Sequence, residues 1–239
     1  MKKPVMMLLW KEWHEQRSKL GFGCLMLMSI TAIALKTRLM PDVSVVWLGI
    51  FIGSFVLPLM AAMGVVAAER ADRTLDRLIS LPVRPWRLMA VKTLAGAVSC
   101  AAPLIGAALV TVFVAGNREI ASEHILTMYC FGIGSAVVLF MWTLALGIGQ
   151  PSEGRVGLVG LGVLGSLGVW LMKLDVAKIS HGNWEIWSAN PLSWMLWVDA
   201  SGIDRRAMPY LPTMALVQLL ICAGLWSWAT ARLTVPRKI

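Results

Sequence analysis

Long apolar runs dominate this sequence, and they set the first limit on what it can fold into. A helix needs about 20 apolar residues to cross the hydrocarbon core of a bilayer. Six segments are candidates for such spans: Leu20–Leu35, Val43–Ala67, Leu94–Ala115, Ile125–Gly149, Val156–Leu174 and Leu211–Ala231. Charged residues make up only 15% of the chain, against about 25% in soluble proteins. The sequence therefore predicts an all-α integral membrane protein with six transmembrane helices in a single transmembrane domain, residues 1–239.

Lysines and arginines are distributed unevenly over the connections between these segments. With the N-terminus in the cytoplasm, 15 of the 22 basic residues lie on the cytoplasmic side and 7 on the other. A basic excess marks the cytoplasmic side of a membrane protein. We therefore expect a multi-pass protein of the cell (inner) membrane with both termini in the cytoplasm. The net charge of +9 is then explained by the basic excess on the cytoplasmic side, and we expect no nucleic-acid partner.

The segment at residues 5–19 has an amphipathic pattern. At helical spacing, one face carries Met6, Leu9, Trp10, Trp13 and Leu20, and the other carries Lys11, Glu12, Glu15, Ser18 and Lys19. This pattern predicts an interfacial helix in contact with membrane lipids, with its indoles at headgroup level. A simple extension of the first span is the alternative.

The connection at residues 175–210 holds four tryptophans, Trp184, Trp187, Trp194 and Trp197, on either side of Asn190-Pro191. Because Pro191 disfavours a continuous helix, the pattern predicts two short interfacial helices on the outer side of the membrane. They either stabilise the outer ends of the spans or form a gate over an exit path.

The fifth predicted span places four glycines on one helical face: Gly157, Gly160, Gly165 and Gly168. Glycine at these positions allows close helix–helix approach. We expect a helix-packing face here, and the sequence leaves open whether it packs within one subunit, between subunits or at a moving contact.

Motifs for catalysis or metal binding are absent from the sequence. It has no His-Glu-x-x-His, no Gly-x-Ser-x-Gly and no phosphate-binding Gly-x-x-x-x-Gly-Lys motif. The four cysteines lie in separate apolar runs, which is typical of buried thiols. We expect no catalytic residue and no metal site, and an intramembrane hydrolase is disfavoured.

The connection between the second and third spans, residues 69–92, is long and amphipathic. Its sequence places Leu75, Leu78 and Ile79 on one helical side, and Leu81-Pro82 ends that helix before Pro85 begins the next. Arg73, Asp76 and Arg77 lie towards the other side. This helix either docks into a groove on a cytoplasmic partner or lies on the lipid headgroups.

This connection resembles the coupling segment of ABC transporter type-2 permeases. The positions that match the family pattern are Glu69, Thr74, Leu75, Leu78, Leu81, Pro82, Val83 and Lys92. Arg73 replaces the usual glycine. The N-terminal "LLWKEWHEQR" and the "NPLSWMLW" before the last span also resemble that family.

The resemblance implies a half-transporter that lacks an ATPase and is not itself an enzyme. Its partners would be a cytoplasmic ATP-binding cassette subunit, which binds ATP and Mg, and a second permease copy in a homo- or heterodimer. The implied coupling residues are Glu69, Arg73, Thr74, Leu75, Asp76, Arg77, Leu78, Ile79, Leu81 and Pro82. The expected function is an ABC exporter permease for a hydrophobic or amphipathic substrate. A non-transporting membrane scaffold or assembly factor is the alternative.

Overall fold

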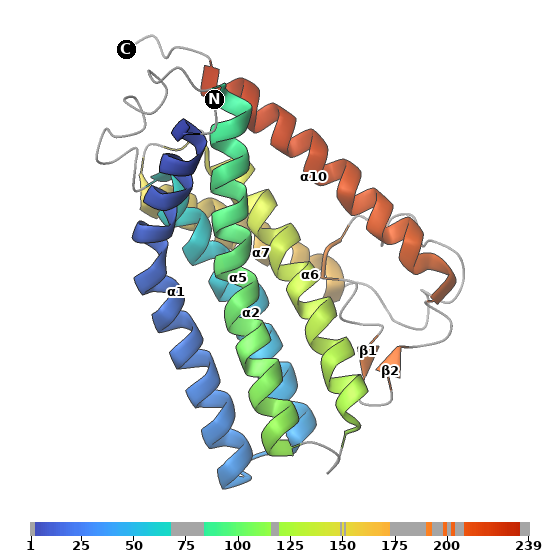
Figure 1. Ribbon diagram of the computed structural model, residues 1–239. Coiled ribbons are helices and arrows are strands. Elements are labelled where there is room, and N and C mark those ends of the chain that lie inside the picture. The colour runs from blue at the N-terminus through green and yellow to red at the C-terminus, as the bar shows by residue number, and fades with distance from the viewer. Residues whose placement is uncertain are drawn as a thin grey trace.

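The computed structural model is a bundle of helices in which α1, α2, α5 and α6 lie side by side (Figure 1). The described residues are 3–67, 84–115, 120–148, 150, 152–172, 190–192, 198–199, 202–203 and 208–234. The helical elements are α1 (Lys3–Thr37), α2 (Asp42–Ala62), the π-helical turn η1 (Met63–Ala67), α5 (Pro85–Ala115), α6 (Ser122–Gly147), α7 (Glu153–Met172), the 3₁₀ turn η3 (Met208–Tyr210) and α10 (Leu211–Thr234). Two short strands, β1 (Val198–Asp199) and β2 (Gly202–Ile203), form an antiparallel pair.

Five of these helices are long and apolar enough to cross a membrane. They are Met6–Thr37, Asp42–Val65, Pro85–Ala115, Ser122–Gly147 and Leu211–Arg232. The sixth predicted span falls on α7, whose apolar part, Gly154–Val169, is shorter than the about 20 residues that a crossing needs. The predicted multi-pass membrane protein is therefore supported by five helices, and the sixth span is not confirmed.

The first four long helices, α1, α2, α5 and α6, alternate in direction (Figure 1). α1 begins at the end of the bundle where η1 ends, where α5 begins and where α6 and α10 end. We call this the N-side end and the opposite one the far end. Helix α6 lies in the middle and packs against α2, α5, α7 and α10, whereas α1 packs mainly against α5.

The core is apolar and lies between α2, α5 and α6. Its fully buried side chains include Val46 and Ile50 of α2, Cys100 and Leu104 of α5, and Phe140 and Leu144 of α6. At Gly96 the α5 backbone lies so close to α6 that a Cβ atom would collide with the Phe140 ring. In a bilayer, helices associate through such close packing because lipid is as apolar as a leucine side chain.

Hydroxyl groups join the helices inside this core. Ser54 Oγ donates a hydrogen bond to the Gly132 carbonyl at 3.0 Å, which links α2 to α6. Tyr129 OH lies 3.2 Å from Thr111 Oγ1, and Thr111 donates to the Ala107 carbonyl of its own helix. Tyr129 must therefore be the donor of the bond that links α6 to α5.

Helix α1 is continuous over 35 residues. At 1.5 Å per residue it is about 52 Å long, against about 30 Å for the hydrocarbon core. The predicted interfacial helix at 5–19 and the predicted span Leu20–Leu35 are thus one element. Residues 5–19 therefore extend the first span as one helix, which was the alternative expectation, and a separate interfacial helix is not confirmed.

The described part of the connection at 175–210 is turn, strand and 3₁₀ helix. Asn190, Pro191 and Leu192 are buried against the middle of α6 and α7, where Ser135 Oγ donates to the Pro191 carbonyl at 2.9 Å. Asn190 Nδ2 donates to the Leu167 carbonyl at 3.3 Å. The four tryptophans lie outside the described residues, and the two predicted interfacial helices are not confirmed.

Candidate functional site

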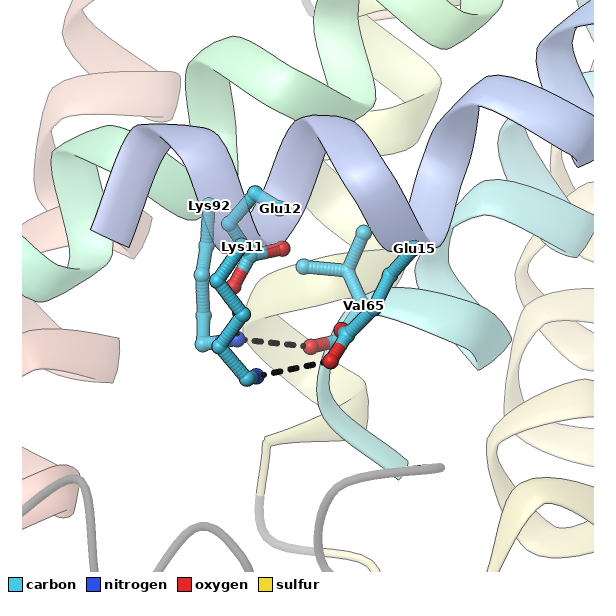
Figure 2. Close-up of polar contacts among 5 residues, drawn as sticks. All are labelled: Lys11, Glu12, Glu15, Val65 and Lys92. Atoms are coloured by element: carbon cyan, nitrogen blue, oxygen red, sulfur yellow. Dashed lines mark hydrogen bonds and ion pairs between the residues drawn. The ribbon is translucent and has the colours of Figure 1, made fainter. Parts of the chain in front are cut away.

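A buried ion pair at the N-side end joins the first and third long helices. Lys92 Nζ of α5 lies 2.8 Å from Glu12 Oε1 of α1, and the two side chains are 1% and 2% exposed. Moving such charges out of water costs several kcal/mol per ion. The short contact between the two charges and the further hydrogen bond of Lys92 offset that cost (Figure 2).

Lys92 also binds the end of the second long helix. Its Nζ donates a hydrogen bond to the Val65 carbonyl of η1 at 3.0 Å. The last carbonyls of a helix have no partner within the helix and carry partial negative charge. The Lys92 ammonium satisfies one of them and complements that charge, so a single side chain links α1, η1 and α5. We call Glu12, Val65 and Lys92 the junction.

Helix packing explains why these groups meet. Leu8 of α1 and Leu88 and Val91 of α5 form a small buried cluster. Glu12 lies one helical turn after Leu8, and Lys92 one turn after Leu88, so both project from the same contact between helices. The apolar cluster thus fixes the register at which the charges pair.

A second lysine, Lys19 of α1, also lies close to η1. A Cβ atom added at Gly64 would stand 2.9 Å from Lys19 Nζ. On the neighbouring face of α1, Lys11 Nζ and Glu15 Oε1 form an exposed i, i+4 pair at 3.1 Å (Figure 2). The turn η1 therefore has two ammonium groups beside its backbone: Lys92 Nζ is hydrogen-bonded to it, and Lys19 Nζ lies close to it. π-Helical turns are frequent at functional sites.

Glu12 corrects one expectation from the sequence. Its predicted place was the polar, outward face of α1, but it is buried together with Leu8 and Gln16. The predicted apolar face, which was expected to contact lipid, is exposed, with Met6 at 72%, Trp10 at 68% and Trp13 at 56%. The physical reason is that lipid is apolar, so indoles face the surroundings and the paired charge faces the protein.

The predicted coupling residues, from Glu69 to Pro82, all lie outside the described residues. The structure does describe both flanks of that segment. It leaves α2 through η1, whose Val65 belongs to the junction, and it returns at Arg84 just before α5 begins at Pro85, as the sequence predicts. The two flanks are therefore tied together through Lys92.

The four glycines of α7 lie in two different environments. A Cβ atom at Gly160 would collide with Leu59 of α2, and one at Gly157 would lie 3.3 Å from Met63 Sδ. At Gly165 and Gly168, no atom of the described residues lies within 4 Å of such a Cβ atom. Gly157 and Gly160 therefore pack against η1 and the end of α2, whereas Gly165 and Gly168 face open space among the described residues.

Sequence reasoning missed the roles of Glu12 and Gln16 and the partner of Lys92. The available signal was the series Leu8, Glu12, Gln16 at i, i+4 and i+8, together with one lysine inside the apolar start of α5. In the described residues, no group of His, Cys, Asp and Glu could hold a metal ion. Comparison with models of known protein families found no match, and comparison with curated proteins found none either.

Proposed function

We propose that this chain is the membrane-spanning permease subunit of an ATP-driven ABC exporter. A separate ATP-binding subunit hydrolyses ATP, and the permease converts that work into movement of a hydrophobic or amphipathic substrate. ATP and Mg are bound by the partner, and a second permease copy completes the transporter. The N-side end is cytoplasmic in this proposal.

The observation that carries the proposal is the attachment of the connection between α2 and α5. Its sequence resembles the family's coupling segment, with Leu75, Leu78 and Ile79 as an apolar surface. Its flanks are tied to each other and to α1 by the bonds from Lys92 to Val65 and Glu12. A force applied to the connection would therefore act on three membrane helices together.

Charge at the N-side end agrees with this orientation. Exposed or half-buried basic side chains of the described residues gather there: Lys11, Arg17, Lys19, Arg84, Arg87, Arg155 and Arg232. The far end of α1 has Lys36 and Arg38. A basic excess at one end is the usual mark of the cytoplasmic side, where an ATP-binding partner would have its substrate.

The proposal is tested by replacing Leu78 with aspartate in the chain expressed in its own host. A carboxylate in a desolvated docking groove costs a few kcal/mol. Leu78→Asp should therefore insert normally but lose the co-purified ATP-binding chain, detected with a photoactivatable ATP analogue, and lose ATP turnover. Leu39→Asp, at a leucine that is 75% exposed between α1 and α2, is the matched control and should keep both.

Two results would contradict the proposal. The wild-type chain, purified from its own membranes in mild detergent, could carry no ATP-binding chain, which favours the scaffold alternative. A correctly inserted Leu78→Asp variant could also keep its partner and its ATP turnover, which favours a helix lying on the headgroups.

A further inference from the structure

The end of the Lys19 side chain lies against the backbone of η1, the last described turn before the connection to α5. A Cβ atom built on Gly64 would stand 2.9 Å from Lys19 Nζ and 3.9 Å from both Lys19 Cδ and Lys19 Cε. Because a carbon–carbon single bond is about 1.5 Å long, the Lys19 ammonium lies at most about 4.4 Å from the Gly64 Cα atom. It therefore takes up space that the side chain of any residue other than glycine would need.

Lys19 has this position although a carboxylate stands on its own helix. Glu15 lies one helical turn before Lys19, and a glutamate four residues N-terminal to a lysine is the favourable order for an ion pair on a helix. Glu15 Oε1 instead lies 3.1 Å from Lys11 Nζ, in the less favourable order. Within the part of the chain that the structure describes, Lys19 forms no ion pair. Its ammonium thus lies beside η1 rather than beside Glu15.

The end of a helix is a favourable place for a cation, because its last carbonyl groups carry partial negative charge. Lys92 meets that charge from α5, where it bonds to the Val65 carbonyl and to the buried Glu12 carboxylate. Lys19 meets it from α1, with an exposed side chain. The two ammonium groups therefore approach η1 from two different helices.

We propose that Lys19 is a positioning residue for the connection at residues 69–92. The ammonium groups of Lys19 and Lys92 hold η1 between α1 and α5, and Gly64 is the position that admits the Lys19 side chain. Together the two lysines fix the direction in which the chain leaves α2. The contact is a property of the single chain, whereas its role in coupling rests on the proposed function.

The contact is tested by a double-mutant cycle, with amide hydrogen exchange of η1 measured on the full chain in nanodiscs. Lys19→Met should make this exchange about two- to fivefold faster, which is the effect of one cation at a helix end. In the Lys19→Met background, Gly64→Ala should slow exchange about fivefold, because alanine is the better helix former. In the wild-type background the slowing should be about two- to fivefold smaller, since the new Cβ atom displaces the ammonium.

The matched control is Arg17→Met, which removes another exposed cation of α1, one that lies 3.4 Å from His14 Nε2. It should leave the effect of Gly64→Ala unchanged. The coupling between Lys19 and Gly64 should shrink between about 0.1 M and about 1 M salt, where the Debye length falls to about 3 Å. Equal effects of Gly64→Ala with and without Lys19 would overturn the proposal, because Lys19 would then extend to the headgroups instead. A coupling that salt does not change would overturn it as well.

The role in coupling is tested with the chain purified from its own host. Lys19→Met should keep the ATP-binding chain, because Leu75, Leu78 and Ile79 are unchanged, but should lower ATP turnover per bound chain about two- to fivefold. Full turnover in a variant whose hydrogen exchange is faster would overturn the positioning role. Absence of an ATP-binding chain from the wild type would contradict the proposed function, whereas the hydrogen-exchange cycle would still decide on the contact.

Discussion

Lys92 is the residue through which three helical elements are connected. Its ammonium is buried, and it bonds to a carboxylate of α1 and to a backbone carbonyl of η1. Neither bond alone would compensate for taking the charge out of water. The junction is therefore sensitive to loss of either charge, while replacement of both by uncharged groups is much better tolerated.

The first prediction follows from that asymmetry. Lys92→Met removes the ammonium that faces the buried Glu12 carboxylate at 2.8 Å, and it should lower the free energy of unfolding by about 3–5 kcal/mol. The double variant Glu12→Gln/Lys92→Met should recover most of the loss. Lys11→Met, which breaks the partly exposed pair with Glu15, should cost less than about 0.5 kcal/mol. Thermal unfolding of the four proteins in detergent measures these differences, and equal losses for Lys92→Met and Lys11→Met would contradict the buried pair.

Glu12 also shows why part of the site could not be predicted from the sequence. Sorting α1 into an apolar and a polar face is possible from the sequence, but deciding which face meets the protein is not. In water the apolar face turns inward, whereas in lipid both the surroundings and the protein interior are apolar. Glu12 is therefore buried, opposite to its expected place on the polar face, while Trp10 and Trp13 lie on the surface of the bundle.

The individual helices were predicted far better than their contacts. Apolar runs located the long helices because a span needs a minimum length, and Pro85 marked the start of α5 because proline suits the first turn. The continuity of α1 through Leu20 was not predictable, since a helix can continue from the interface into the bilayer without any local signal. The environment of each glycine on α7 depends on which helix lies opposite, which no local pattern contains.

The second prediction compares two of these glycines by the same substitution. Gly160→Leu places a side chain against Leu59 and Thr143 and should cost about 1–3 kcal/mol of stability through overpacking. Gly165→Leu has open space among the described residues and should leave the stability of the single chain unchanged. Unfolding midpoints in detergent check this, and a larger loss for Gly165→Leu would show that α7 is packed differently.

The first and last long helices meet at the same end of the bundle. α1 begins at the N-side end and α10 ends there, so the first and last described turns lie at the same end (Figure 1). α6 and α10 both end at the N-side end, so these two helices run in the same direction. Between them along the chain, α7 carries Leu167, whose carbonyl accepts a hydrogen bond from the buried Asn190.

The third prediction concerns orientation in the membrane. If the N-side end is cytoplasmic, topology reporters fused after Arg84 and after Lys238 should report the cytoplasm. Reporters fused after Arg118 and after Asp199 should report the opposite side. An outward signal from Arg84 would place the connection from α2 to α5 away from ATP and would contradict the proposed function.

The most direct measurement of the proposed coupling is a photo-crosslinking amino acid at Leu78, illuminated in the native membrane. If the connection docks on an ATP-binding subunit, the crosslinker should give one main protein adduct, and mass spectrometry should identify that adduct as an ATP-binding chain. The same crosslinker at Leu39, exposed at the other end of the bundle, should not give this adduct. Crosslinking of Leu78 to lipid alone, or to the same partners as Leu39, would contradict the proposal that this connection receives force from an ATPase.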